Sequence, residues 1–239
     1  MNKLLLYFFV LISFISCQKE EVLLPKTNIS ILKDINDYST VYLFFNTDKK
    51  DTLVKINKNN TISSTNWIFH IDKRLKLKHI VKDLKKLQDK KNNSVHKKEG
   101  SINVFSYTDT ISKTLAFLPF TETNYIFNDE FSKFYIKENA DIYISYNNLS
   151  LNFKKDNTIT VDGNAVEKNE LIAFLKEFSA FTSEDKITLI HLNFDENLSF
   201  NEYLQYKVLL QNLISEKIKI SPLEFIYNEK KLPECNCAL

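Results

Sequence analysis

The chain contains very few glycines, and this scarcity limits the kinds of site that it can build. Only Gly100 and Gly163 occur among its 239 residues. Phosphate-binding loops, dinucleotide fingerprints and the nucleophile turns of serine hydrolases each need several glycines at fixed spacing, because the backbone must turn tightly or approach a ligand closely there. The composition therefore nearly excludes these classes of site.

Charge and apolar content are those of an ordinary globular protein. The net charge is +2 and 44% of the residues are hydrophobic, which is enough for a substantial core. A dedicated nucleic-acid binder is usually much more basic, so we expect no nucleic-acid partner.

The first sixteen residues have the pattern of a secretory signal peptide. Lys3 supplies a short positive region, and residues 4–15 form an apolar run. This run is shorter than the ~20 apolar residues that a membrane-spanning helix needs, whereas its length is typical of a signal peptide. We therefore expect residues 1–16 to be removed.

The leader ends in Phe14-Ile15-Ser16-Cys17, which resembles the lipobox of bacterial lipoproteins. The resemblance implies cleavage before Cys17, lipidation of that residue with palmitate-like chains, and anchoring of the mature protein to the membrane. An ordinary signal peptide, or a short N-terminal anchor, with an incidental cysteine is the alternative. The acidic pair Glu20-Glu21 resembles export signals of surface lipoproteins, and a solvated tether explains it equally well. We expect an outer-membrane protein, with the periplasmic and cell-surface faces both open.

Hydrophobic periodicity predicts an α+β fold, with small mixed sheets, helices on one face, and two related lobes. Pro25 opposes regular structure near the start. The expected divisions are a lipidated tether over residues 17–36, a lobe over 37–121, a connector over 122–140, a lobe over 141–228 and a C-terminal tail over 229–239.

Strands and helices alternate in both lobes. In the first lobe we expect strands over residues 40–45, 52–56, 66–71 and 102–107 and a lysine-rich helix over 75–90, with residues 111–120 ambiguous. In the second we expect strands over 142–146, 149–153, 158–161, 187–193 and 223–227, the last after Pro222, and helices around 171–178 and 203–213. Residues 41–46 echo residues 142–147, which suggests that the first lobe is a diverged copy of the second.

Residues 141–228 resemble the periplasmic domain of the ExbD/TolR family. The resemblance lies in an order of features: Ile-Thr-Val-Asp-Gly-Asn-Ala-Val over 159–166, a helix with Glu170-Leu171, a strand over 187–192, a turn at Asp195, and a helix whose apolar face begins at Tyr203 and Val208. A further run over 218–220 leads to the last strand. Any small α+β domain with this order is the alternative.

The departure from that family bears on function. Members that drive proton-powered motors carry an acidic residue inside a transmembrane helix, whereas the leader of this chain holds no Asp or Glu. The resemblance therefore implies a non-catalytic binding or accessory module of the envelope. Its partner is expected to be a component of a TonB/ExbD-type system or peptidoglycan, bound for instance by strand addition, with the oligomeric state open.

Catalytic and metal-binding residues are not evident. The histidines are His70, His79, His96 and His191, and no two have the spacing of a metal site. His191 and Asp195 are placed so that they could meet at the C-terminal end of the expected strand, and Asp195-Glu196 is an adjacent acidic pair. We expect no cofactor and no metal. An uncharacterised envelope hydrolase is the alternative function, recognisable by a deep pocket in which carboxylates or a histidine converge.

Two further features have alternative explanations. Cys235 and Cys237 form a Cys-x-Cys pair, which is compatible with a strained disulfide, a disulfide-linked dimer, metal capture or incidental cysteines in a tail. Residues 73–98 are dense in lysine, which suits either a solvated helix face or attraction to the phosphates of a membrane surface.

Overall fold

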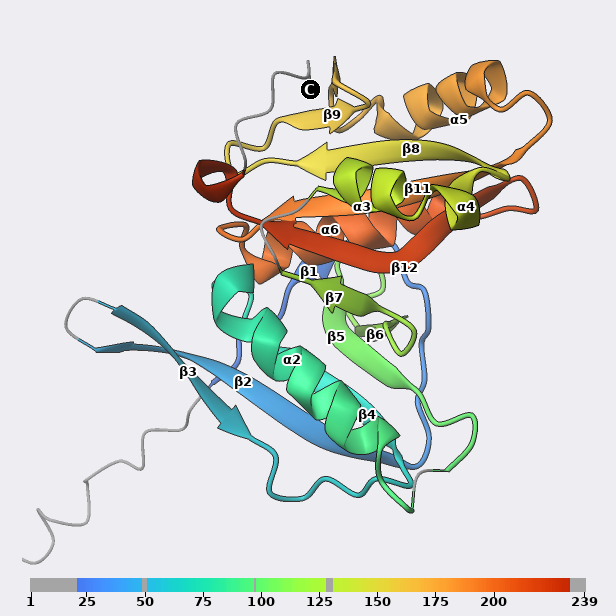
Figure 1. Ribbon diagram of the computed structural model, residues 1–239. Helices are drawn as coiled ribbons and strands as arrows, with labels where there is room; N and C mark the ends of the chain where they lie inside the picture. Colours follow the sequence, from blue (N-terminus) through green and yellow to red (C-terminus); the bar gives the residue numbers. More distant parts are fainter. Residues whose placement is uncertain (1–20, 49–50, 97, 128–130, 233–239) are drawn as a thin grey trace, which may run out of the picture.

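The computed structural model describes residues 21–48, 51–96, 98–127 and 131–232, which form two lobes, each built around one mixed β-sheet (Figure 1). This confirms the expected α+β class. Within these ranges no helix combines the length and the apolar character that a membrane span requires.

The first sheet lies in the N-terminal lobe. Its strands run in the order β3 (Asp51–Asn57), β2 (Tyr38–Asp48), β4 (Asn66–Ile71) and β5 (Asn103–Asp109), and β5 also pairs with β6 (Leu115–Pro119) and β1 (Lys26–Thr27). Helix α2 (Leu77–Asn92) connects β4 to β5 and buries Leu77, Ile80, Val81, Leu84 and Leu87. These residues recur at helical spacing, which is why the helix presents one apolar face to the sheet.

The second sheet lies in the C-terminal lobe. Its order is β10 (Asn164–Val166), β9 (Ile159–Val161), β8 (Tyr146–Phe153), β11 (Ile187–Asp195), β12 (Ile218–Tyr227) and β7 (Asn124–Ile126). Helix α5 (Leu171–Thr182) precedes β11, and helix α6 (Phe200–Leu210) connects β11 to β12. A capping box of Ser199 and Glu202 begins α6, because each side chain satisfies a backbone N–H at the helix start.

The connector is part of the second lobe. It supplies β7 at the edge of the sheet and helix α3 (Ser132–Glu138). The backbone N–H of Ser132 donates to Asn193 Oδ1 at 2.7 Å, whereas Ser179 of α5 bonds to Thr188. Because side chains alternate along a strand, Asn193 and Thr188 face opposite sides of β11. Helices therefore cover both faces of this sheet and not one face as expected, as Figure 1 shows.

Two other segments differ from the sequence expectations. Residues 140–143 form helix α4 (Ala140–Tyr143) where a strand was expected over 142–146, and β8 begins only at Tyr146. The segment expected to be a tether packs on the first lobe from its first described residues onward. Pro25 is buried, and its carbonyl accepts a hydrogen bond from the N–H of Thr108 at 2.9 Å. This bond uses only the carbonyl of residue 25, so the missing N–H of proline does not weaken it.

The two lobes repeat the same order of elements. The strands and helix β2, β3, β4, α2 and β5 correspond to β8, β9, β11, α6 and β12, and the second lobe adds β10 and α5. Each repeat has the same turn before its helix, Asp-x-x-Leu-x followed by an apolar residue, at residues 72–77 and 195–200. Leu43 pairs with Ile71 and Phe153 pairs with Phe194. The true repeat therefore aligns residue 43 with 153, and the expected match of 41–46 to 142–147 is wrong.

The two turns bind each other through their backbones. The N–H of Leu77 donates to the carbonyl of Leu198 at 3.0 Å, and the N–H of Phe200 donates to the carbonyl of Leu75 at 2.7 Å. A second pair joins Lys78 to Glu196 and Asn201 to Lys73 in the same way. The two bonds of each pair are equivalent, because matching the first repeat to the second converts one bond into the other. An approximate twofold axis therefore relates the lobes at this contact.

One hydrophobic core joins both lobes. The Phe105 ring of β5 stacks on Phe120 with centroids 3.7 Å apart and meets Phe200 of α6 edge-on at 5.2 Å. Aromatic rings bury large areas and favour these two arrangements. The lobes are therefore packed together through side chains as well as through the paired turns.

Candidate functional site

A pocket of about 640 Å³ opens between the lobes. The first lobe contributes residues 99–102 and 119–121, the start of the connector contributes residues 122 and 123, and the second lobe contributes Leu192 of β11, α6, the segment after it, and β12. The apolar residues of its lining include Phe120, Leu192, Leu210, Ile214, Ile220 and Pro222. Both its size and its mixture of apolar walls with a few polar groups are typical of small-ligand sites.

An irregular pairing of β12 shapes one wall of the pocket. Ile220 pairs with Ile190, and the next pair is Glu224 with Leu192, so three residues of β12 stand opposite one residue of β11. Pro222 lies within this bulge, where the missing N–H of proline removes no ladder hydrogen bond. The last strand therefore begins at Ile218, before Pro222, and not after it as expected.

A buried group of charged and phenolic side chains lies beside the pocket. Lys207 of α6 donates to Glu224 Oε1 of β12, and the two side chains are only 7% and 3% exposed. The hydroxyl of Tyr203 donates to Glu224 Oε2 at 2.6 Å. Lys207 Nζ also donates to Thr123 Oγ1 at 3.3 Å, which links the group to the start of the connector, between β6 and β7 (Asn124–Ile126). Burial, and then the negative charge of Glu224, raise the pKa of Tyr203 well above its usual value, so Tyr203 remains a donor.

The corresponding positions of the first lobe are apolar. Tyr203 and Lys207 follow the first residue of α6 by three and seven positions, and at the same distances from its first residue α2 has Ile80 and Leu84. Glu224 pairs with Leu192, and the equivalent pair in the first lobe is Phe105 with Phe69. Relative to the first lobe, the second lobe therefore has tyrosine in place of isoleucine, lysine in place of leucine and glutamate in place of phenylalanine. The same fold forms with apolar side chains at these three places.

Further polar groups line the pocket. Ser101 is buried, and within the described residues its hydroxyl has no hydrogen-bond partner. Glu99 and Glu122 are exposed at the rim. With Glu224 they outnumber Lys207 among the charged lining residues, so the formal charge of the lining is negative and favours a ligand that carries a positive group.

The histidines considered from sequence lie elsewhere. None of His70, His79, His96 and His191 is among the residues that line this pocket. His191 Nε2 bonds to Asn148 Oδ1 at 3.0 Å, whereas Asp195 accepts the backbone N–H of Asn197 at 2.7 Å. Because a strand rises about 3.3 Å per residue, His191 and Asp195 are roughly 13 Å apart, so the structure does not bring them together.

In the part of the chain that the structure describes, no three His, Cys, Asp or Glu side chains are grouped as metal ligands. Cys17, Cys235 and Cys237 lie outside the described residues.

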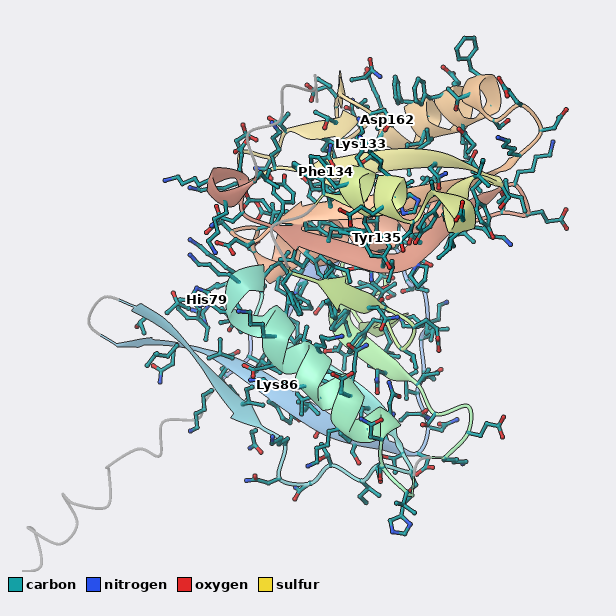
Figure 2. The ribbon with its side chains drawn as sticks, in the orientation of Figure 1. His79, Lys86, Lys133, Phe134, Tyr135 and Asp162 are labelled. Carbon is teal, nitrogen blue, oxygen red and sulfur yellow. The ribbon has the colours of Figure 1, made fainter. Side chains whose placement is uncertain are left out.

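A second polar layer lies under α3, on the other side of the second sheet. Asn193 donates to the hydroxyls of Ser132 and Ser150, which also bond to each other at 2.8 Å. Lys133 of α3 lies 3.8 Å from Asp162 at the edge of this layer (Figure 2). His191 is fully buried beside it, and its Nδ1 has no partner among the described residues. This layer is filled by its own hydrogen bonds and holds α3 on the sheet.

The protein is expected to lose stability in acid through His191. Burial lowers the pKa of His191 to about 4, against an ordinary value of 6.5. The unfolded chain therefore binds this proton more readily, and stability falls as the pH drops from about 6.5 to 4, by about 3 kcal/mol. Urea unfolding at several pH values measures the loss. His191→Asn should show a smaller loss over this window, and equal slopes in both proteins would contradict the assignment. His70, whose pKa burial also lowers, stays in both proteins.

Sequence reasoning missed the residues that define this pocket. Lys207 lies between Tyr203 and Val208, at which the apolar helix face was expected to begin, and this placement of a charge was the available signal. Aligning the two Asp-x-x-Leu turns would have set Lys207 against Leu84. Its partner Glu224 follows the bulge at Pro222, and no sequence period indicates that pairing.

Comparison of the chain with protein-family models, with curated proteins and with solved structures finds no match in any of the three.

Proposed function

We propose that this chain is a non-catalytic binding module of the cell envelope, held in the outer membrane by lipid at Cys17, with the interlobe pocket as its binding site. The partner is a peptide segment, either from an envelope protein such as a component of a TonB/ExbD-type system or from peptidoglycan. No cofactor is required. The resemblance of residues 141–228 to ExbD/TolR domains remains part of this proposal.

The observation that carries the proposal is the difference between the two repeats at the pocket. One repeat has Ile80, Leu84 and Phe105, and the other has Tyr203, Lys207 and Glu224 in the same places. A buried ion pair is often no more stabilising than well-packed apolar residues. Since the first lobe folds without the polar group, folding alone does not account for it, and a role toward a bound molecule does.

The lining of the pocket indicates the chemistry of the ligand. Ile214, Ile220 and Pro222 offer an apolar surface, and Ile214 is 52% exposed. Glu99 and Glu122 at the rim favour a positive charge. A peptide with one apolar side chain and one ammonium or guanidinium group satisfies both requirements.

Hydrolysis receives less support than binding. Glu224 already accepts hydrogen bonds from Lys207 and Tyr203, whereas a carboxyl group that acts as acid or base must reach the substrate. Release of soluble fragments from sacculi by the protein, lost in Glu224→Gln, would establish the hydrolase alternative.

A matched pair of substitutions tests the binding proposal. Ile214→Glu places a charge on the apolar wall, and Ile144→Glu makes the same change at a residue 73% exposed after α4, which does not line the pocket. The tagged, lipidated proteins are used for affinity capture from native envelope and for co-sedimentation with sacculi. We expect Ile144→Glu to retain the partner and Ile214→Glu to lose it by about tenfold or more, because the apolar contact would bury an unpaired charge.

Two results would contradict the proposal. If both variants capture the same partner as the parent protein, the pocket is not the binding site. If the parent captures neither an envelope protein nor sacculi, the binding function itself is refuted.

A further inference from the structure

The first sheet has an aromatic surface on the side away from α2. Val41, Leu43 and Phe69 are buried in the core on the α2 side. Alternation along the strands places Tyr42, Phe44 and His70 on the other side, where their rings stack with centroids 5.8 and 4.8 Å apart. We call this the outer surface of the first sheet. It holds a shallow pocket of about 440 Å³ lined by Glu21, Val22, Leu24, Tyr42, Phe44, Asn57 and His70.

The β2–β3 hairpin extends this outer surface. Leu53 pairs with Asn46 and so lies on the same side of the sheet as Phe44, and it is 47% exposed. The hairpin projects from the first lobe (Figure 1). The outer surface thus combines half-buried rings with an exposed leucine, whereas exposed apolar residues on a monomer are usually scattered singly.

The N-terminal segment is fixed to the body beside this surface. The N–H of Leu23 donates to Asp72 Oδ2 at 3.1 Å, and its carbonyl accepts the N–H of Lys73 at 2.8 Å. Thr108 is bonded to Pro25 in the same way. The described chain is therefore attached to the body from its first residues, and not only after residue 36 as the expected tether implied.

This attachment places the outer surface close to the lipid. Cys17 is four residues before Glu21, and four residues span at most about 14 Å when fully extended. We infer that the outer surface of the first sheet, with Tyr42, Phe44 and Leu53, lies against the lipid headgroups of the anchoring membrane. This inference rests on the proposed lipidation of Cys17.

The chemistry of the surface suits a lipid interface. Tyrosine has an apolar ring and a polar tip, which favour the boundary between headgroups and acyl chains.

The same orientation turns the lysine-rich helix away from the membrane. Lys78, Lys82, Lys86 and Lys90 are exposed on α2, on the opposite side of the first sheet, and Figure 2 shows Lys86 on this helix. Docking of these lysines on anionic lipid is therefore the competing orientation, and one experiment separates the two.

Spin labels on the full lipidated chain report the orientation. Leu53→Cys and Lys82→Cys are made in a chain whose Cys235 and Cys237 are serine, and each is labelled in vesicles of phosphatidylethanolamine and phosphatidylglycerol. We expect the label at 53 to collide severalfold more with oxygen and severalfold less with a nickel chelate than the label at 82. The reverse result would establish docking through α2, and two equally water-exposed labels would also overturn the inference.

Flotation separates this inference from the proposed anchoring. The labelled chain should float with the vesicles, and Cys17→Ala should not be retained through lipid. A parent chain that fails to float would refute the anchoring and the orientation together, whereas a floating chain with a water-exposed label at 53 refutes the orientation alone.

Discussion

Replacing Lys207 with methionine should lower the free energy of unfolding by about 3 to 5 kcal/mol, because it leaves the carboxylate of Glu224 buried without its counter-charge. Glu224 is 3% exposed and, among the residues that the structure describes, keeps only the hydroxyl of Tyr203 as donor in that variant. Urea unfolding followed by circular dichroism measures the change. Lys219→Met is the matched control, since Lys219 is exposed on β12, and it should stay within about 0.5 kcal/mol of the parent.

Adding Glu224→Leu to Lys207→Met should restore most of that stability. The double variant removes both charges and approaches the apolar pattern of Leu84 and Phe105 in the first lobe. Replacing a whole buried pair is often neutral, whereas breaking it is costly. A double variant as unstable as the single one would mean that the second lobe needs the pair in order to fold.

The double variant also tests the role of the pair in binding. If it is stable and no longer captures the envelope partner, the pair belongs to the binding site, as proposed. If it is stable and captures the partner as well as the parent does, the pair has no part in recognition.

Phe105→Ala should destabilise the whole molecule by about 3 to 5 kcal/mol, because it opens a cavity in a closely packed core. The Phe105 ring contacts Phe120 of the first lobe and Phe200 and Tyr203 of the second. Phe181→Ala is the control, since Phe181 is 85% exposed, and should change stability little.

Because the Phe105 ring packs against residues of both lobes, we expect a single unfolding transition. Trp67, the one tryptophan, lies in the first lobe, so its fluorescence reports that lobe, whereas circular dichroism reports both. The two signals should coincide in the parent and in Phe105→Ala. Separate transitions, with only the fluorescence curve displaced by the substitution, would contradict a shared core.

Much of the local structure was predictable because it depends on neighbouring residues. The strand over residues 66–71 has the bounds expected, and the apolar spacing of Leu77, Ile80, Val81, Leu84 and Leu87 correctly indicated α2. The connector was not predictable in this way. Its strand β7 has three residues and α3 has seven, which are too short to show a period, and both depend on contacts with β12 and Asn193.

The sequence by itself determined the α+β class, the order of most strands and helices, and the exclusion of glycine-rich sites, since these follow from local spacing and composition. Only the tertiary structure decided how the two Asp-x-x-Leu turns bind each other, where Pro222 bends β12, and which side of the first sheet adjoins the N-terminal segment. It also brought Lys207 to Glu224 and Thr123. These contacts join residues far apart in the chain, and their geometry depends on packing and strand register, which the periodicity of one sequence does not specify.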